Sequence, residues 1–168
     1  KMCNAKIKFI PYKENIENFK KYINRKTKLF ILNNPNNPRG RVYGEDEIRK
    51  IYKLCRENGV YFMVDEAYSD FMIKGFPSLA KVAPSKDGVI IVNSLSKNLG
   101  VSGWRIGYII CNKFLREQII KFNQHLITCA PTILCMYIEK YFDMIIPAAE
   151  KEINKLIKKR LRVEEYMN

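Results

Sequence analysis

The run Val89-Ile90-Ile91-Val92-Asn93-Ser94-Leu95-Ser96-Lys97 decides how this 168-residue chain is interpreted. Its first four residues are wholly apolar, which is typical of a strand buried on both faces. Lys97 follows just past the carboxyl end of this strand, with hydroxyl side chains three and one residues before it and Arg105 eight residues after it. In an open α/β sheet this end of the strands is where ligands bind. The run therefore predicts a ligand site around Lys97.

The side chains of this run suit one kind of ligand. A lysine that loses its solvation can form a Schiff base with a carbonyl group. The hydroxyls of Ser94 and Ser96 and the guanidinium of Arg105 suit a phosphate group. A carbonyl and a phosphate in one small molecule indicate pyridoxal phosphate as the cofactor.

The composition is that of an ordinary globular protein, with 47% hydrophobic and 28% charged residues. A chain of 168 residues has room for one domain with a real core. No apolar stretch approaches the roughly 18 residues of a membrane-spanning helix, and no secretory signal is recognisable. We therefore expect a cytoplasmic protein with no membrane partner.

Cysteine and histidine offer little to a metal ion. The five cysteines are scattered, no pair has C-x-x-C spacing, and their odd number does not indicate a disulfide framework. His125, the single histidine, is expected to be structural or to face solvent. We expect no metal site.

The net charge of +13 raises the question of nucleic acid. The basic residues are spread along the chain and mixed with acids, as in Lys151-Glu152-Ile153-Asn154-Lys155. No helix-turn-helix, zinc-finger or RNA-binding signature is present. We therefore expect no specific nucleic-acid partner, although a basic surface favours anionic cofactors and substrates.

Strand-like and helix-like segments alternate, which predicts an α/β fold with a mainly parallel sheet sandwiched by helices. The pattern predicts strands over residues 5–10, 29–32, 60–64, 89–92 and 104–111. It predicts helices over residues 16–23 and 48–55, and then over 113–127, 131–142 and 147 to the end.

Three successive predicted strands each run into a polar cluster. Asn37 lies in a turn rich in proline and asparagine, Asp65 and Tyr68 follow the next strand, and Lys97 follows the third. If the strands are parallel, these clusters collect along one edge of the sheet. There, Asp65 can pair with a pyridine nitrogen, and Tyr68 and Asn37 can hydrogen-bond a phenolic oxygen of the cofactor ring.

Three motifs occur in order: Asn36-Asn37-Pro38-x-Gly40, Asp65-x-Ala67-Tyr68, and Ser94-x-Ser96-Lys97-(seven residues)-Arg105-x-Gly107. With them the chain resembles the pyridoxal-phosphate-dependent fold-type I aminotransferases of classes I and II. The resemblance implies that residues 1–146 form part of the large cofactor-binding domain. It also implies that residues 147–168 form a C-terminal helix leading toward a small domain that is absent from the chain.

The resemblance further implies a role for each matched residue. Lys97 corresponds to the Schiff-base lysine, which also moves a proton between the substrate Cα and the cofactor C4′. Asp65 corresponds to the partner of the pyridinium nitrogen, and Tyr68 and Asn37 to the ligands of O3′. The phosphate contacts correspond to Ser94, Ser96 and Arg105. The family also implies amino-acid and keto-acid substrates and a homodimer.

Some features leave alternatives open. Arg39 stands where the family commonly has threonine, as a surface change or as a contact with an anionic substrate. Glu66 is expected in a supporting or solvated role. The same motifs serve β-lyases, decarboxylases and synthases, and a truncated domain without catalysis is a third interpretation. The chain alone is expected to turn over slowly or not at all.

Overall fold

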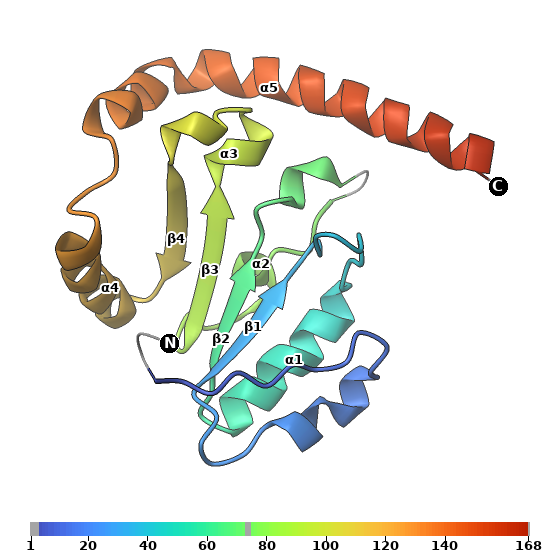
Figure 1. The fold of residues 1–168 in the computed structure, drawn as a ribbon, viewed down its shortest axis with the longest axis vertical. Coiled ribbons are helices and arrows are strands. Elements are labelled where there is room, and N and C mark those ends of the chain that lie inside the picture. Colours follow the sequence, from blue (N-terminus) through green and yellow to red (C-terminus); the bar gives the residue numbers. More distant parts are fainter. Residues whose placement is uncertain (1–3, 73–74, 168) are drawn as a thin grey trace.

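A central four-stranded sheet organises the computed structural model, which describes residues 4–72 and 75–167 (Figure 1). The strands lie in chain order: β1 (Leu29–Asn33), β2 (Tyr61–Asp65), β3 (Val89–Ser94) and β4 (Gly107–Cys111). β1 pairs with β2 and β2 with β3 in parallel, whereas β4 is antiparallel to β3. The predicted α/β fold with a mainly parallel sheet is confirmed.

Helices connect and flank these strands. The α-helices are α1 (Glu45–Glu57), α2 (Leu79–Val82), α3 (Leu95–Asn98), α4 (Lys113–Leu126) and α5 (Thr132–Met167). The short 3-10 helices of the described residues are η1 (Ile16–Tyr22), η2 (Ser69–Phe71) and η3 (Ser102–Trp104). None of the helices in the described ranges is long and apolar enough to cross a membrane.

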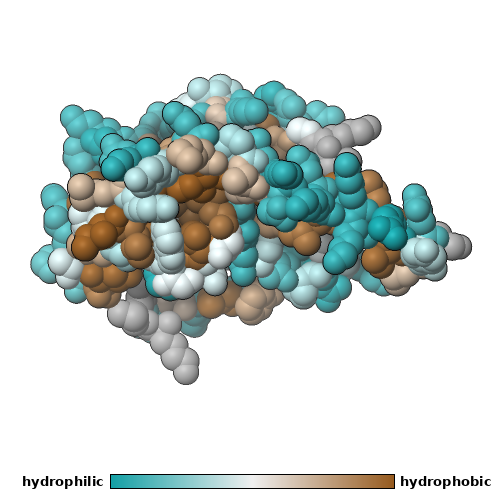
Figure 2. All heavy atoms as spheres, turned by 90° about the horizontal axis from the view of Figure 1, so that it is seen from above, coloured by the Kyte–Doolittle hydropathy of each residue, from teal (hydrophilic) through white to brown (hydrophobic). Residues whose placement is uncertain are grey.

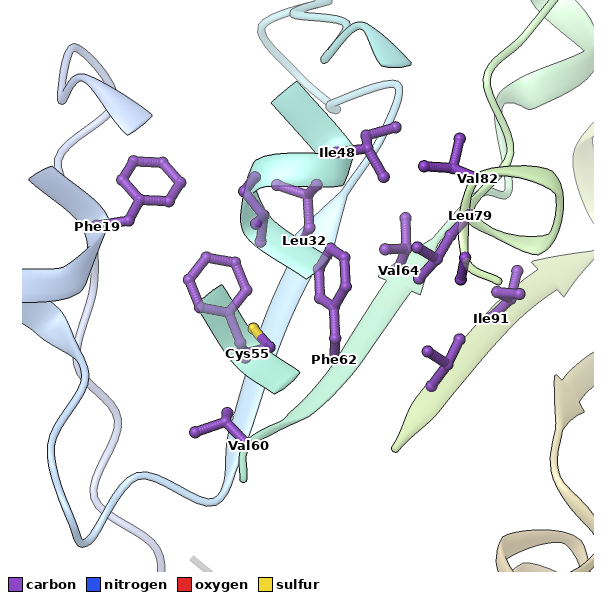
Figure 3. Close-up of a cluster of buried hydrophobic side chains, with 14 residues drawn as sticks. Phe19, Leu32, Ile48, Cys55, Val60, Phe62, Val64, Leu79, Val82 and Ile91 are labelled. Carbon is purple, nitrogen blue, oxygen red and sulfur yellow. The ribbon is translucent and has the colours of Figure 1, made fainter. Parts of the chain in front are cut away.

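The core lies between the sheet and α1 (Figure 3). α1 buries Ile48, Ile51 and Cys55, whose helical spacing places them on one face. Acidic residues in its first turn interact favourably with the positive end of the helix dipole. Gly59, whose φ is 61°, follows the last turn and allows the chain to leave the helix. The same core cluster contains alternate strand residues, which are Phe30, Leu32, Phe62, Val64, Val89 and Ile91.

The α-helices α1 and α2, which lie between the parallel strands, are on the same face of the sheet, since they bury side chains in one core cluster. Parallel strands in chain order with right-handed crossovers produce this arrangement. The opposite face is open at β1, where Ile31 is 60% exposed. By contrast, Phe62 on the covered face is 1% exposed.

The prediction of a strand over residues 5–10 is wrong. This segment is irregular and mostly exposed, and Phe9 is 84% exposed. Ile10, at the end of the segment, packs against the core. Alternating apolar residues form a strand only where a neighbouring strand supplies hydrogen bonds and a surface to pack on. Among the described residues, no strand pairs with this segment.

The C-terminal helices follow the prediction with one shift. α4 agrees with the helix predicted over 113–127. The helices predicted over 131–142 and from 147 onward form α5, whose non-helical break is at Tyr141 rather than at Pro147. α5 then runs across the carboxyl ends of the parallel strands (Figure 1).

Apolar side chains gather on the outer surface over the first part of α5, whereas its second part is largely hydrophilic (Figure 2). The exposed apolar residues of the first part are Ile133, Met136, Tyr137, Phe142 and Met144. The second part is rich in lysine, arginine and glutamate residues.

Candidate active site

The three predicted polar clusters meet at one end of the sheet. Because β1, β2 and β3 are parallel, the segments that follow them emerge on the same side. Asn37 lies in the turn after β1, Asp65 ends β2, and Ser94 ends β3. Lys97 lies in α3, which begins directly after β3.

Asn37 and Tyr68 form a direct pair, although 31 residues separate them in sequence. The Asn37 Nδ2 donates a hydrogen bond of 2.9 Å to the Tyr68 hydroxyl. The end of β1 also fixes the turn that contains Asn37, since the Asn37 backbone N–H donates a hydrogen bond of 2.7 Å to the Asn33 Oδ1. The two O3′ ligands implied by the family resemblance therefore lie together.

Asn34 supports this turn from inside the protein and was not identified from the sequence. Its side chain is fully buried and exchanges two hydrogen bonds with the Tyr43 backbone. A buried amide needs such partners, because an unsatisfied one is costly. The cluster of asparagines in this turn is the only sequence signal that points to it.

Lys97 is exposed and its amine lies near the same tyrosine. The Lys97 Nζ is 5.7 Å from the centroid of the Tyr68 ring, within the range of a cation–π contact. The lysine, the phenol and the Asn37 amide thus form one group at the end of the sheet.

Asp65 is half-buried between its neighbours at the end of β2. Its Oδ1 accepts a hydrogen bond of 3.1 Å from the Ala67 N–H, which fixes the carboxylate at the start of the following loop. Its backbone carbonyl accepts from the Asn34 N–H at 2.9 Å, which links this loop to the Asn37 turn. Within the described ranges, no hydrogen bond joins its carboxylate to Lys97 or Tyr68.

The backbone segments that carry the predicted phosphate contacts lie close together, whereas their side chains form separate hydrogen bonds. The Ser94 hydroxyl accepts from the Ser96 N–H at 3.2 Å. The Leu95 N–H donates to the Ile106 carbonyl at 3.1 Å, which brings the residue after Arg105 against the start of α3. The Arg105 guanidinium itself donates to the Ser102 carbonyl at 2.8 Å, within its own loop.

Gly107 has a steric reason to be glycine. A Cβ at this position would lie 2.7 Å from the Asn93 carbonyl oxygen of β3, closer than real Cβ contacts. Glycine thus allows β4 to pair closely with the strand that precedes Lys97.

Glu66 follows Asp65 in the sequence, but its side chain is directed into the core and not toward the group at the end of the sheet. Its carboxylate is buried and accepts hydrogen bonds from the Ser78 hydroxyl at 2.7 Å and the Leu79 N–H at 2.8 Å. Burial raises the pKa of Glu66, and these two hydrogen bonds act in the opposite direction. Glu66 therefore anchors the start of α2 to the end of β2.

Arg39 is directed to a neighbouring aromatic ring. Its guanidinium carbon lies 4.1 Å from the centroid of the Tyr12 ring. This stacking is a cation–π contact. Of the two interpretations of Arg39, the structure favours a structural surface contact.

A cavity of about 250 Å³ adjoins the Asn37–Tyr68 pair. The turn after β1 and the η2 segment form most of its wall, and Arg160 from α5 completes it. The sequence did not identify Arg160, because an arginine on the polar face of a helix is ordinary. Only the path of α5 over the sheet brings it to this site.

The side chains at this end of the sheet fit pyridoxal phosphate. An amine, a carboxylate, and a phenol hydrogen-bonded to an amide come from three neighbouring strand ends, as a cofactor with an aldehyde, a ring nitrogen and a phenolic oxygen requires. Two hydroxyls, of Ser94 at the end of β3 and of Ser96 in α3, are available for the phosphate.

Comparison with known proteins gives a consistent family. The family model "Aminotransferase class I and II" matches residues 1–164. The (5-formylfuran-3-yl)methyl phosphate transaminase of Methanocaldococcus jannaschii is 35% identical over 144 residues, covering 85% of this chain and 37% of that protein. The aspartate aminotransferase of Sulfurisphaera tokodaii is 31% identical over 150 residues, covering 87% and 36%.

Solved structures agree in fold. A Pyrococcus protein described as protein-A1 superposes with a TM-score of 0.81 at 26% identity, covering 90% of this chain and 40% of that one. A double mutant of the Thermus thermophilus aspartate aminotransferase has a TM-score of 0.76 at 25% identity, covering 89% and 38%. The chain spans less than two-fifths of the length of the two curated relatives. With the family model matched over residues 1–164 and the same fold in these structures, the chain belongs to the class I and II aminotransferases, as its three motifs predicted.

Proposed function

We propose that this chain is the cofactor-binding part of a pyridoxal-phosphate-dependent aminotransferase that moves an amino group from an amino acid to a keto acceptor. The observation that carries the proposal is the group formed by Asn37, Tyr68 and Lys97. The 2.9 Å hydrogen bond between the first two and the 5.7 Å approach of the lysine amine place three matched side chains together. Family membership supports the reaction type.

Lys97 is proposed to hold the cofactor covalently through its amine and to move the proton at the substrate Cα. When bound, pyridoxal phosphate supplies an electron sink for the negative charge that develops at this carbon. The Asp65 carboxylate, fixed by the Ala67 N–H, is proposed to keep the ring nitrogen protonated. Tyr68 and Asn37 are proposed to hydrogen-bond the ring oxygen.

The phosphate is proposed to lie at the start of α3. Ser94 and Ser96 supply hydroxyls there, and the Leu95–Ile106 backbone hydrogen bond keeps the Arg105 loop beside them. The guanidinium of Arg105 is proposed to supply the opposite charge.

The remaining assignments concern the whole protein. We propose a cytoplasmic homodimer acting on amino-acid and keto-acid substrates. Residues 1–146 are proposed as part of the cofactor domain, and residues 147–168 as the helix leading to a second domain. A longer relative supports the idea of a further domain, since the 144 residues matched in this chain correspond to 37% of that protein.

Covalent capture of the cofactor tests the central assignment. Pyridoxal phosphate is added to the chain, the adduct is reduced with borohydride, and the modified peptide is identified by mass spectrometry. We expect modification at Lys97 and its loss in Lys97→Ala. Lys97→Arg is the matched control, because it keeps the positive charge but does not condense with an aldehyde under these conditions.

Modification spread over several lysines, or unchanged in Lys97→Ala, would contradict the assignment of Lys97.

The reaction type is tested separately by adding an amino acid to the loaded chain. Conversion of the cofactor to pyridoxamine phosphate, reversed by a keto acid, distinguishes transamination from lyase or decarboxylase chemistry.

A further inference from the structure

Asp70 and Asn98 form a hydrogen bond between the two segments that carry Tyr68 and Lys97. The Asn98 Nδ2 donates to the Asp70 Oδ2 at 2.7 Å, across 28 residues of sequence. Asp70 lies in η2, shortly after Tyr68, and Asn98 ends α3, directly after Lys97. Because the acceptor is a carboxylate, the bond is charge-assisted and stronger than one between neutral groups. It therefore joins the backbone near the lysine to the backbone near the tyrosine.

Asp70 is a firm anchor, because the loop around it is fixed on both sides. The Ser69 N–H donates to the carbonyl of the buried Glu66 at 2.9 Å. On the other side, the Arg160 Nη1 donates a hydrogen bond of 3.2 Å to the Phe71 carbonyl. These contacts hold η2 to the end of β2 and to α5, so the fold itself sets the position of the Asp70 carboxylate.

The short helix α3 depends on such an anchor. It has only four residues, Leu95–Asn98, and helices this short are not stable by themselves. The Asn98 side chain is used at both ends, since its Oδ1 accepts from the Leu99 N–H at 2.9 Å while its Nδ2 reaches Asp70. Among the described residues, no other side-chain hydrogen bond joins residues 95–98 to residues 66–72.

The place at which α3 is held decides where the Lys97 amine can reach. The amine stands at the end of a flexible stem, and its Nζ lies 5.7 Å from the centroid of the Tyr68 ring. A misplacement of about 1 Å can cost roughly 100-fold in rate when a reacting group must be aligned. Lys97 therefore benefits from a contact that fixes its own turn of helix to the Tyr68 loop.

We infer that Asp70 and Asn98 are positioning residues, which hold Lys97 over the Tyr68 ring and prepare its amine to condense with pyridoxal phosphate. This inference rests on the proposed function, because the pair acts through Lys97. In the condensation the neutral amine forms a double bond to the aldehyde carbon, and the aldehyde oxygen leaves as water with the two amine protons. The pair takes no part in these bonds and changes only the point from which the amine starts.

A matched pair at the opposite end of β3 and β4 provides the control. The Asn112 Nδ2 donates to the Asp87 Oδ1 at 3.0 Å, and the Asn112 Oδ1 accepts from the Leu115 N–H at 2.9 Å. Asp87 precedes β3 and Asn112 follows β4, and these strands are antiparallel. The second pair thus has the same chemistry and the same exposed setting as the first, but it lies away from Lys97.

The rate at which Lys97 captures pyridoxal phosphate is the first measurement. The full chain is mixed with the cofactor, samples are reduced with borohydride at successive times, and the Lys97 peptide is quantified by mass spectrometry. We expect Asp70→Ala to slow the modification of Lys97 roughly fivefold or more, because the amine loses its alignment. Asp87→Ala should leave the rate unchanged, and other exposed lysines in the same samples should react equally in all three proteins.

Asp70→Asn separates position from charge. The introduced amide keeps an acceptor oxygen for Asn98 and removes the negative charge. We expect capture at Lys97 within about threefold of the natural rate, since a neutral hydrogen bond replaces a charge-assisted one. A rate as low as that of Asp70→Ala would mean that the carboxylate acts on the amine by its charge, and it would overturn the inference.

The second measurement follows the amine without the cofactor. Reductive methylation with isotope-labelled formaldehyde gives each lysine amine an NMR signal, and the signal that is missing in Lys97→Arg identifies Lys97. A methyl group held over an aromatic ring is displaced by the ring current. We expect this displacement in the natural chain and in Asp87→Ala, and its loss in both Asp70→Ala and Tyr68→Leu. Circular dichroism checks that each variant folds.

Equal capture rates in Asp70→Ala and the natural chain, or a Lys97 signal that Asp70→Ala does not move, would overturn the inference. An equal loss in Asp70→Ala and Asp87→Ala would overturn it as well, because it would indicate a general loss of stability. Failure of the natural chain to capture the cofactor at Lys97 contradicts the proposed function. Capture at Lys97 combined with indifference to Asp70 contradicts the positioning role alone.

Discussion

Tyr68 connects the three side chains at the centre of the candidate site. Its hydroxyl accepts from Asn37 and its ring lies under the Lys97 amine. Asn37 and Lys97 belong to segments 60 residues apart, so the tyrosine is their common contact. This single side chain is the most direct point at which to test the ring-oxygen assignment.

Tyr68→Phe keeps the ring and removes the hydroxyl. We expect the affinity for pyridoxal phosphate to fall roughly 2- to 13-fold, which corresponds to a net hydrogen bond of about 0.5–1.5 kcal/mol. A shift of the cofactor's absorption maximum is expected as well, and both are measured by spectrophotometric titration. Tyr166→Phe, on an exposed tyrosine near the end of α5, is the control, and an equal loss in both variants would contradict the assignment.

Glu66 predicts a specific dependence of stability on pH. Burial raises its pKa in the folded protein above the ordinary value of 4.5, so the folded state holds the proton more tightly than the unfolded state. The stabilisation is complete below the unfolded pKa and is lost as pH rises through the raised folded pKa. Glu66→Gln does not titrate there, so its stability relative to the natural chain should be greatest near neutral pH.

Urea unfolding followed by circular dichroism between pH 4 and pH 7 measures this difference. We expect the free energy of unfolding of the natural chain to increase relative to that of Glu66→Gln as the pH falls. Glu165→Gln, at an exposed position, should show no such trend. A difference that is constant with pH would show that Glu66 ionises equally easily in both states.

At the scale of the elements, the sheet has one covered and one open face at β1. α1 and α2 both pack on the side of Phe62, while Ile31 is on the other side. The alternation of strand residues therefore separates those that hold the fold together from those that do not.

Phe62→Ala and Ile31→Ala test this difference between the faces. Phe62 packs edge-on against Phe30 in the core, so its truncation is expected to lower the free energy of unfolding by about 3–5 kcal/mol. Ile31→Ala is expected to cost under about 1 kcal/mol, because little surface is buried there. Equal costs in chemical denaturation would mean that the second face is also covered in solution.

The elements also show where sequence reasoning works. Buried strands and the Asn37, Asp65 and Lys97 clusters were predictable, because local apolar runs followed by turns determine them. The segment 5–10 has a strand-like pattern without a partner strand, and partners are not a local property. Arg160 was not predictable for the same reason, since its place depends on how α5 leaves the break at Tyr141.

At the scale of the whole molecule, Cys55 reports on global unfolding. It is 1% exposed within the core, and burial raises the pKa of its thiol to about 12. The thiol is therefore both protonated and inaccessible at neutral pH, whereas Cys129 is exposed. A reagent can reach Cys129 directly, whereas it can reach Cys55 only after the core has opened.

Iodoacetamide should label Cys129 quickly and Cys55 more than ~1,000-fold more slowly, because labelling of a core thiol requires unfolding that costs several kcal/mol. Mass spectrometry of the labelled peptides measures both rates in one sample. In increasing urea, labelling of Cys55 should rise together with the loss of helical circular dichroism. Fast labelling of Cys55 without denaturant would show that α1 detaches from the sheet locally.

The order of the strands, which is the same in space and in sequence, has a consequence for synthesis on the ribosome. Each strand finds its neighbour already made, so the sheet can grow by one strand at a time as the chain emerges. At ~5–20 residues per second, the segment from Arg105 to Arg160 follows within several seconds. The nascent chain thus presents every proposed cofactor ligand before α5 arrives, and cofactor capture can stabilise the growing domain while Arg160 is still to be translated.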